Sequence, residues 1–127
     1  MTDDESPNPW AKIIGPCYTT TGLARTLGWT EAKVADAGET LQLLVLETGD
    51  GVTLYPAFQL HDGRVVDGLS DVLAVLQTGT AGHWTWAKWL NIALPDKDPP
   101  RAIDALRVGR LDEVLRDAEH DAWAWRS

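Results

Sequence analysis

Two pairs of neighbouring residues, His61-Asp62 and His120-Asp121, combine the side chains that most often carry out acid–base chemistry. Adjacent residues on a helix point to different sides, and His61 belongs to a predicted turn, so neither pair is expected to act as a catalytic dyad. The 3 histidines of the chain also lack the close spacing of zinc ligands, since only His83 lies between these pairs. We therefore expect solvated surface positions here.

Cys17 is the single cysteine of the chain, which excludes an internal disulfide and a cysteine-rich zinc site. We expect this thiol to pack as a small hydrophobic group. The sequence has no Gly-x-Ser-x-Gly elbow, Walker loop, dinucleotide-binding glycine fingerprint or His-Glu-x-x-His motif. We therefore expect no enzyme, no cofactor and no metal site.

Tryptophan is unusually frequent, with 7 residues in a chain of 127 that has 1 Phe and 2 Tyr. Large aromatic side chains anchor protein interfaces and also fill the cores of small domains. Trp86 and Trp89 share a helical face that suits core packing, whereas Trp84 does not share it. Trp123 and Trp125 lie near the C-terminus, where they either fold back onto the domain or dock into a partner.

Basic residues gather in residues 97–116, which hold 5 of them against 4 acidic residues in a chain of net charge −8. Arg107 and Arg110 flank Gly109, and cations at such a position stabilise a helix C-terminus. Together with Arg101, these arginines can instead anchor a charged partner surface. Both interpretations stay open from the sequence.

Residues 22–28 and 31–38 each follow a threonine N-cap and end at a glycine, which predicts two short helices joined by a tight turn. This is the arrangement of a helix-turn-helix. Within residues 30–40, however, 3 acidic residues oppose 1 basic residue, a balance that repels phosphate. Only Arg25 and Lys33 offer basic side chains for DNA, so a structural helix-turn-helix competes with a DNA reader.

Residues 41–47 and 52–55 flank an Asp-Gly turn, which predicts a β-hairpin. Helix, helix and hairpin in this order predict a degenerate winged helix-turn-helix domain over residues 10–79. The acidic residues 1–9 have no periodic apolar pattern and are expected to form a disordered tail. A segment rich in glycine and threonine, residues 78–82, marks the expected domain boundary.

Residues 83–127 are expected to form a helical unit, with helices on both sides of a proline-rich loop at residues 94–100. The predicted fold class is therefore mainly α with a small β-hairpin. The longest purely apolar stretch is 4 residues, 43–46, whereas roughly 20 are needed to span a bilayer. No signal peptide is recognisable, and we expect a cytoplasmic protein with no membrane contact.

The second half of the chain resembles a known family in its motif order. Trp89-Leu90-Asn91 precedes a proline-bearing loop, and residues 100–115 follow as Pro-Arg-Ala-Ile-Asp-Ala-Leu-Arg-Val-Gly-Arg-Leu-Asp-Glu-Val-Leu. This pattern resembles the C-terminal toxin-binding domain of Xre/MbcA/ParS-type antitoxins. Residues 21–28 and 50–60 are similar to the N-terminal half of actinobacterial relatives, so the resemblance covers about residues 18–116.

The resemblance implies a bacterial antitoxin of a type II toxin–antitoxin system that covers the NAD-binding cleft of a RES-domain toxin. Many relatives also bind their own operator DNA through the N-terminal helices, where Arg25 and Lys33 lie. The protein would then form a homodimer or a hetero-oligomer with the toxin. The candidate toxin-binding residues are Trp84, Trp86, Trp89, Arg101, Arg107, Arg110, Trp123 and Trp125.

Two other functions remain compatible with these residues. One is a dimeric winged helix-turn-helix transcription regulator that binds DNA, and the other is an accessory protein of an unrelated enzyme. Under the antitoxin interpretation, truncation after Glu113 or replacement of Trp123 and Trp125 by alanine is expected to weaken protection from the toxin.

Overall fold

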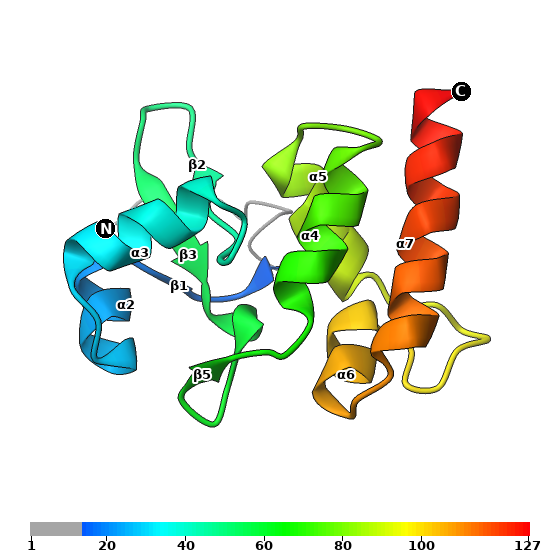
Figure 1. Ribbon diagram of the computed structural model, residues 1–127, viewed down its shortest axis with the longest axis horizontal. Helices are drawn as coiled ribbons and strands as arrows, with labels where there is room; N and C mark the ends of the chain where they lie inside the picture. The colour runs from blue at the N-terminus through cyan, green and yellow to red at the C-terminus, as the bar shows by residue number, and fades with distance from the viewer. Residues whose placement is uncertain (1–13) are drawn as a thin grey trace, which may run out of the picture.

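The computed structural model describes residues 14–127 and confirms a mainly helical fold with small antiparallel sheets. In chain order the elements are β1 (Cys17–Tyr18), α2 (Thr20–Leu27), α3 (Glu31–Glu39), β2 (Leu46–Glu47), β3 (Thr53–Pro56), the 3-10 helix η2 (Ala57–Gln59), β4 (Leu60–His61), β5 (Arg64–Val65), α4 (Leu69–Gln77), α5 (His83–Asn91), α6 (Ala102–Arg107) and α7 (Leu111–Arg126). Figure 1 shows the elements up to β5 on one side and α4 to α7 on the other. Within residues 14–127, no helix combines the length and apolar composition needed to cross a bilayer.

The two N-terminal helices lie where the sequence predicted them, but α2 begins at Thr20 instead of Gly22, and α3 continues past Gly38 to Glu39. The Thr19 hydroxyl accepts a hydrogen bond from the Gly22 backbone N–H at 3.0 Å, and the Thr30 hydroxyl does the same for Lys33 at 3.0 Å. Gly28 ends α2 with a φ of 72°, a left-handed conformation that favours glycine. Local capping chemistry therefore fixes the turn between α2 and α3.

The sheet beside these helices has the strand order β1-β3-β2, with all pairs antiparallel. The predicted hairpin is present but short, because its first strand covers only Leu46–Glu47 instead of residues 41–47. Leu41 has a φ of 65°, which turns the chain away from an extended path. Leu43 and Leu44 are nevertheless buried, so their apolar character reports core positions outside the strand.

The side chain of Gln59 explains why Leu44 needs no strand partner. Its Oε1 accepts a hydrogen bond from the Leu44 backbone N–H at 2.8 Å, and its Nε2 donates to the Leu44 and Pro56 carbonyls, both at 3.0 Å. Gln59 is 0% exposed. A buried amide therefore supplies the hydrogen bonds that a neighbouring strand would otherwise give.

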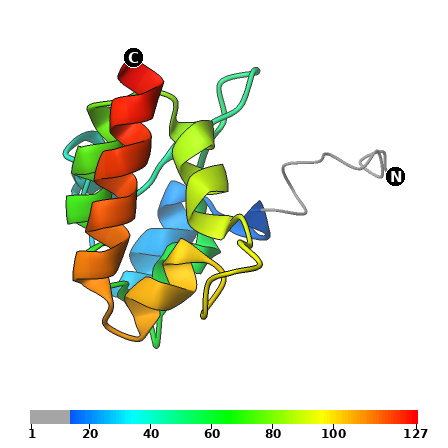
Figure 2. The same ribbon diagram turned by 90° about the vertical axis from the view of Figure 1, so that its right-hand side faces the viewer.

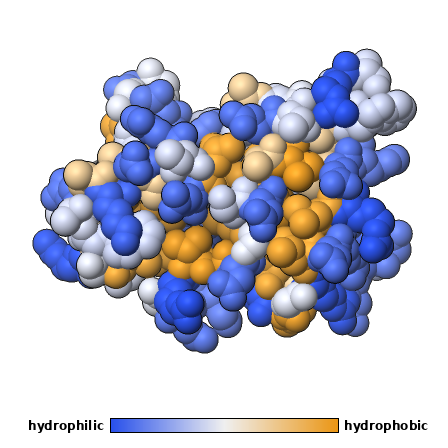
Figure 3. Space-filling model, viewed as in Figure 1, coloured by the Kyte–Doolittle hydropathy of each residue, from blue (hydrophilic) through white to orange (hydrophobic). Residues whose placement is uncertain are grey.

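The largest hydrophobic cluster lies around α4, which packs along α7. It also contains Leu44 and Leu46 from the first half of the chain, so this core includes side chains from both sides of the predicted boundary at residues 78–82. Figure 3 shows apolar residues gathered around α4 and along its seam with α7, with hydrophilic residues on the outer side of α7. A smaller cluster holds α2 and α3 against β3.

The last helix continues to Arg126, close to the end of the chain. Ala122 is buried, and a Cβ atom on Gly79 would lie only 2.6 Å from the Ala122 carbonyl oxygen. Arg126 also donates a hydrogen bond to the Thr78 hydroxyl at 2.9 Å. The C-terminal turns of α7 are therefore tied to the end of α4.

We expect Gln59→Leu to lower the free energy of unfolding by about 2 to 4 kcal/mol, because Leu44 would keep a buried N–H and a buried C=O without partners. Chemical denaturation followed by tryptophan fluorescence measures the change. Gln77→Leu, at an exposed position on α4, is the matched control and is expected to change stability by less than about 0.5 kcal/mol. Equal stability of the two variants would contradict the structural role of Gln59.

Candidate functional site

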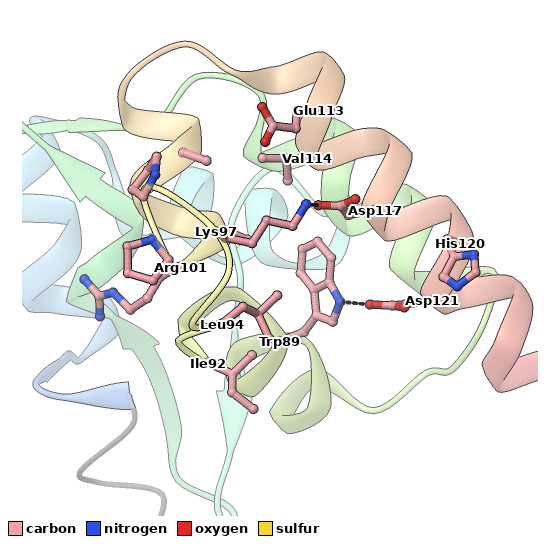
Figure 4. Close-up of a pocket in the computed structure, with 14 residues that line it drawn as sticks. Trp89, Ile92, Leu94, Lys97, Arg101, Glu113, Val114, Asp117, His120 and Asp121 are labelled. Carbon is pink, nitrogen blue, oxygen red and sulfur yellow. Dashed lines mark hydrogen bonds and ion pairs between the residues drawn. The ribbon is translucent and has the colours of Figure 1, made fainter.

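A pocket of about 230 Å³ lies where α5, the loop at residues 92–100, α6 and α7 meet. Figure 2 shows these elements together on one side of the molecule, and Figure 4 shows the side chains that line the pocket. Trp89 from α5 and Ile92 and Leu94 from the loop supply apolar surface. On the opposite wall, α7 supplies carboxylates.

The loop that forms one wall of the pocket is held by hydrogen bonds at several points. The Leu94 N–H donates to the Pro100 carbonyl at 3.0 Å, which closes the loop at its base. Lys97 Nζ forms an ion pair with Asp117 Oδ2 at 2.9 Å, and Arg110 donates to the Asp98 carbonyl at 2.6 Å. The hydrogen bond and the charge of Asp117 raise the pKa of Lys97, so this side chain stays cationic.

Trp89 joins α5 to α7 across the pocket. Its indole N–H donates a hydrogen bond to Asp121 Oδ2 at 2.7 Å, and Figure 4 shows the ring between the loop and α7. Trp89 remains partly exposed. The predicted binding residue therefore presents one surface to the pocket while its polar edge is already bound within the fold.

Arg101 and Arg107 meet at a shared carboxylate, Asp104. Arg101 donates two hydrogen bonds to it at 2.9 and 3.2 Å, and Arg107 donates one at 3.0 Å. Arg101 also donates to the Asn91 side chain at 3.2 Å, and Arg107 to the Phe58 carbonyl at 2.6 Å. These two arginines therefore connect α6 to α5 and η2.

The ion pairs of this cluster have an electrostatic consequence. The hydrogen bonds from Arg101, followed by the charges of Arg101 and Arg107, hold the pKa of Asp104 below its ordinary value of 3.8, although partial burial acts in the opposite direction. Asp104 is therefore ionised at neutral pH, and it neutralises part of the positive charge that the sequence offered to a partner.

The structure removes Trp86 from the predicted contact surface. This side chain is 1% exposed, stacks on His83 with a centroid distance of 4.3 Å, and donates its indole N–H to the Thr80 carbonyl at 3.0 Å. A side chain buried in the main core has no surface to present to a toxin in this fold. Trp84 is partly buried and donates to the Glu47 carbonyl at 3.0 Å, which ties α5 to β2.

The two C-terminal tryptophans differ in their surroundings although both lie on α7. Trp125 is 37% exposed, and its ring would contact a Cβ atom placed on Gly79, so it packs against the end of α4. Trp123 is 60% exposed on the outer side of the helix. Of the eight candidate toxin-binding residues, Trp123 is the aromatic side chain with the most surface available.

The outer surface of α2 and α3 is exposed but carries little positive charge. Arg25 lies exposed in the last turn of α2. The Lys33 ammonium lies 4.3 Å from the centroid of the Trp29 ring, a cation–π contact within the turn. Acidic residues on the same helix, including Glu31 and Asp36, are exposed beside it.

The remaining reactive side chains form no catalytic arrangement within residues 14–127. His61 and Asp62 contact each other at 3.5 Å, yet both are largely exposed, as the sequence predicted. His120 lines the pocket, while Asp121 is turned toward Trp89. Partial burial raises the pKa of the Cys17 thiol, and no cluster of three or more His, Cys, Asp or Glu in the described residues can hold a metal ion.

The pocket itself was missed by the sequence interpretation, although α7 carries a signal for it. Glu113, Asp117 and Asp121 recur at intervals of four residues, which places their side chains along one face of the helix. The sequence could have shown that face, but not that Trp89 and Lys97 lie opposite to it. Those contacts depend on the path of the intervening loop.

Comparison with known proteins supports the fold and goes no further. No protein-family model and no characterised protein matches the sequence. Among solved structures, the chain is similar to one described as the NMR structure of Rv2175c, with a TM-score of 0.70 and 24% sequence identity. The match covers 92% of this chain and 85% of that chain, so the similarity extends through both halves of the fold.

We expect Asp104→Asn to destabilise the protein by roughly 1 kcal/mol at pH 7, a value reduced for partial solvent screening. Because the folded-state pKa of Asp104 lies below the unfolded-state value, its contribution is complete well above pH 3.8 and is lost as the pH falls through the folded-state pKa. The stability difference between wild type and variant should therefore shrink below about pH 4. Denaturation curves between pH 3 and pH 7 measure it, with Asp36→Asn on the exposed face of α3 as the control. A difference independent of pH would contradict this assignment.

Proposed function

We propose that this chain is an antitoxin that binds a RES-domain toxin and occludes its NAD-binding cleft. The single observation that carries the proposal is the position of Trp123, a large aromatic side chain left 60% exposed on a helix whose opposite face is packed. Tryptophan at such a position is the residue type most enriched among the energetic anchors of protein interfaces. The motif resemblance of residues 89–115 supplies the class of partner.

The rigidity of α7 supports this role. Val114, Ala118 and Ala122 are buried, and Arg126 is bonded to Thr78 at the end of α4. A helix held in this way presents Trp123 in a fixed orientation, so little conformational entropy is lost when a partner binds. Occluding a cleft requires such a pre-organised surface and no catalytic group on the antitoxin.

Charge provides a second, weaker support. The net charge of the chain is −8, whereas a cleft that binds the phosphates of NAD needs positive charge. Opposite charges of this kind accelerate association at low ionic strength. Arg110 is exposed and keeps one of the predicted cations at the surface, but Arg101 and Arg107 serve the internal Asp104 cluster.

The structure changes the truncation experiment that the sequence suggested. A chain ending at Glu113 would lose Val114, Ala118 and Ala122 from the core, and with them the helix that packs along α4. Such a truncation is expected to unfold the protein, so loss of toxin protection would report folding. Single substitutions on the outer side of α7 are the appropriate test.

We expect Trp123→Ala to weaken the complex with the toxin by about 30-fold or more, the loss typical of an interface anchor. Titration calorimetry measures the affinity, and growth during co-expression with RES-domain toxins, starting with any encoded beside this chain, measures protection. Val52→Ala, at an exposed apolar residue of the β2–β3 turn, is the matched control and should keep affinity within about twofold of wild type. Wild-type affinity of the Trp123→Ala variant would exclude the outer face of α7, and failure of the wild-type protein to bind any such toxin would exclude the proposed function.

A DNA-binding function is the second candidate, and the topology favours it. The element order β1, α2, α3, β2, β3 with the sheet order β1-β3-β2 is compatible with a winged helix-turn-helix, in which β2 and β3 form the wing. In that arrangement α3 would enter the major groove. The acidic residues of α3 oppose this function, because they repel phosphate.

An electrophoretic mobility-shift assay with DNA from upstream of the gene separates the two candidates. Under the antitoxin proposal, we expect no tight binding by the protein alone at about 150 mM salt, since few phosphates can be neutralised. Tight binding that weakens with salt and is lost in Lys33→Ala and Arg25→Ala would favour the regulator instead. The Trp123→Ala variant should leave any DNA binding unchanged, because its side chain lies outside the helix-turn-helix.

A further inference from the structure

We infer that the pocket between α5, the 92–100 loop and α7 receives an arginine side chain of the partner protein. The inference rests on the proposed function only for the identity of that partner. Its basis is the chemistry of the lining, which is apolar on the α5 and loop side and acidic on the α7 side. An arginine matches both parts, because its methylene stem is apolar and its guanidinium is cationic.

The volume of the pocket suits a single side chain. Sites for cofactors and drug-sized molecules usually enclose about 300 to 1,000 Å³. The present pocket has a volume of about 230 Å³ and is partly open to solvent. It therefore suits the end of a side chain that enters from another protein surface better than a whole cofactor.

The apolar part of the pocket begins at its mouth. Ile92 and Leu94 line the pocket and are 44% and 41% exposed, although both are large hydrophobic residues. Farther in, Trp89 and Ala105 extend the apolar surface. A methylene stem lying along these residues would cover surface that water contacts in the free protein.

The carboxylates of the acidic part of the pocket can accept more hydrogen bonds than they do in the free protein. Asp117 is paired with Lys97, but Asp121 accepts only one hydrogen bond within residues 14–127, from the neutral indole of Trp89. The Glu113 side chain forms no hydrogen bond or ion pair within the same part of the chain and acts on Lys97 only through its charge. Since an ionised carboxylate can accept several hydrogen bonds, Glu113 and Asp121 can each accept from a donor-rich cation.

The chain itself already places a cation in this environment. Lys97 reaches across from the loop, and its ammonium lies at the carboxylate of Asp117, as Figure 4 shows. The nearby Arg101 does not compete for the α7 carboxylates, because its guanidinium is bound to Asp104 and Asn91. A guanidinium from a partner would therefore add to the Lys97–Asp117 pair or exchange with it.

Titration of the uniformly ¹⁵N-labelled full chain with N-acetyl-arginine methylamide tests the inference. The Trp89 indole N–H resonance, assigned with Trp89→Phe, reports directly on the pocket because that group bonds to Asp121. We expect a saturable shift with a dissociation constant of roughly millimolar, as befits one isolated side chain. N-acetyl-norleucine methylamide, which has an apolar side chain without the guanidinium, should bind at least fivefold more weakly.

Asp121→Asn separates charge recognition from folding. The asparagine amide oxygen can still accept the Trp89 hydrogen bond, so we expect the pocket to persist while arginine affinity falls at least threefold. Asp36→Asn, which removes an exposed carboxylate from α3, should leave the titration unchanged. The inference is overturned if wild type shows no saturable shift, if norleucine binds as well as arginine, or if Asp121→Asn binds like wild type.

These outcomes can be told apart from those of the proposed function. The probe is a free arginine derivative, so a failed titration overturns the arginine pocket while leaving the measured toxin affinity as it was. Conversely, absence of a toxin complex overturns the antitoxin proposal and leaves the titration result standing. Reduced toxin affinity of the Asp121→Asn variant, with wild-type affinity of Asp36→Asn, would place the pocket in the interface.

Discussion

A buried amide joins Leu44 to the end of strand β3 in this protein. Gln59 satisfies both backbone groups of Leu44 and the carbonyl of Pro56 while it is itself inaccessible to water. Leu44 belongs to the main core around α4, whereas Pro56 ends the strand that pairs with both neighbours in the three-stranded sheet. Because unpaired polar groups are costly in such a place, this amide holds Leu44, a residue of the main core, beside the end of β3.

Helix α7 has three faces with different surroundings. Its core face carries Ala118, which packs in the cluster around α4. Its pocket face carries Asp117 and Asp121, which bind Lys97 and Trp89 from other elements. Its outer face carries Trp123, which contacts solvent. A single helix with three chemically different faces is a suitable scaffold for recognising another protein, since packing on one face holds the other two in position.

The charged side chains divide into a group that is paired within the fold and a group that is left at the surface. Around α6, Asp104 occupies Arg101 and Arg107, so these cations stabilise the fold rather than extend the surface charge. Along α7, the Glu113 carboxylate has no hydrogen-bonded partner in the described residues. The surface offered to a partner is consequently more acidic than the cluster of basic residues at 97–116 suggested. This favours a basic partner over nucleic acid, in line with the acidic face of α3.

The sequence by itself determined the elements whose signals are local. The Thr19 cap determines where α2 begins, because its hydrogen bond connects residues three positions apart, and the left-handed Gly28 determines where the helix ends. Only tertiary structure decided the roles that depend on distant neighbours. It turned residues 41–45 away from a strand, placed Trp86 in the core and Trp123 in solvent, and brought Trp89 to Asp121 across 32 positions of sequence. Residue type predicts what a side chain can do, but the burial and partners that select its role arise from packing between elements.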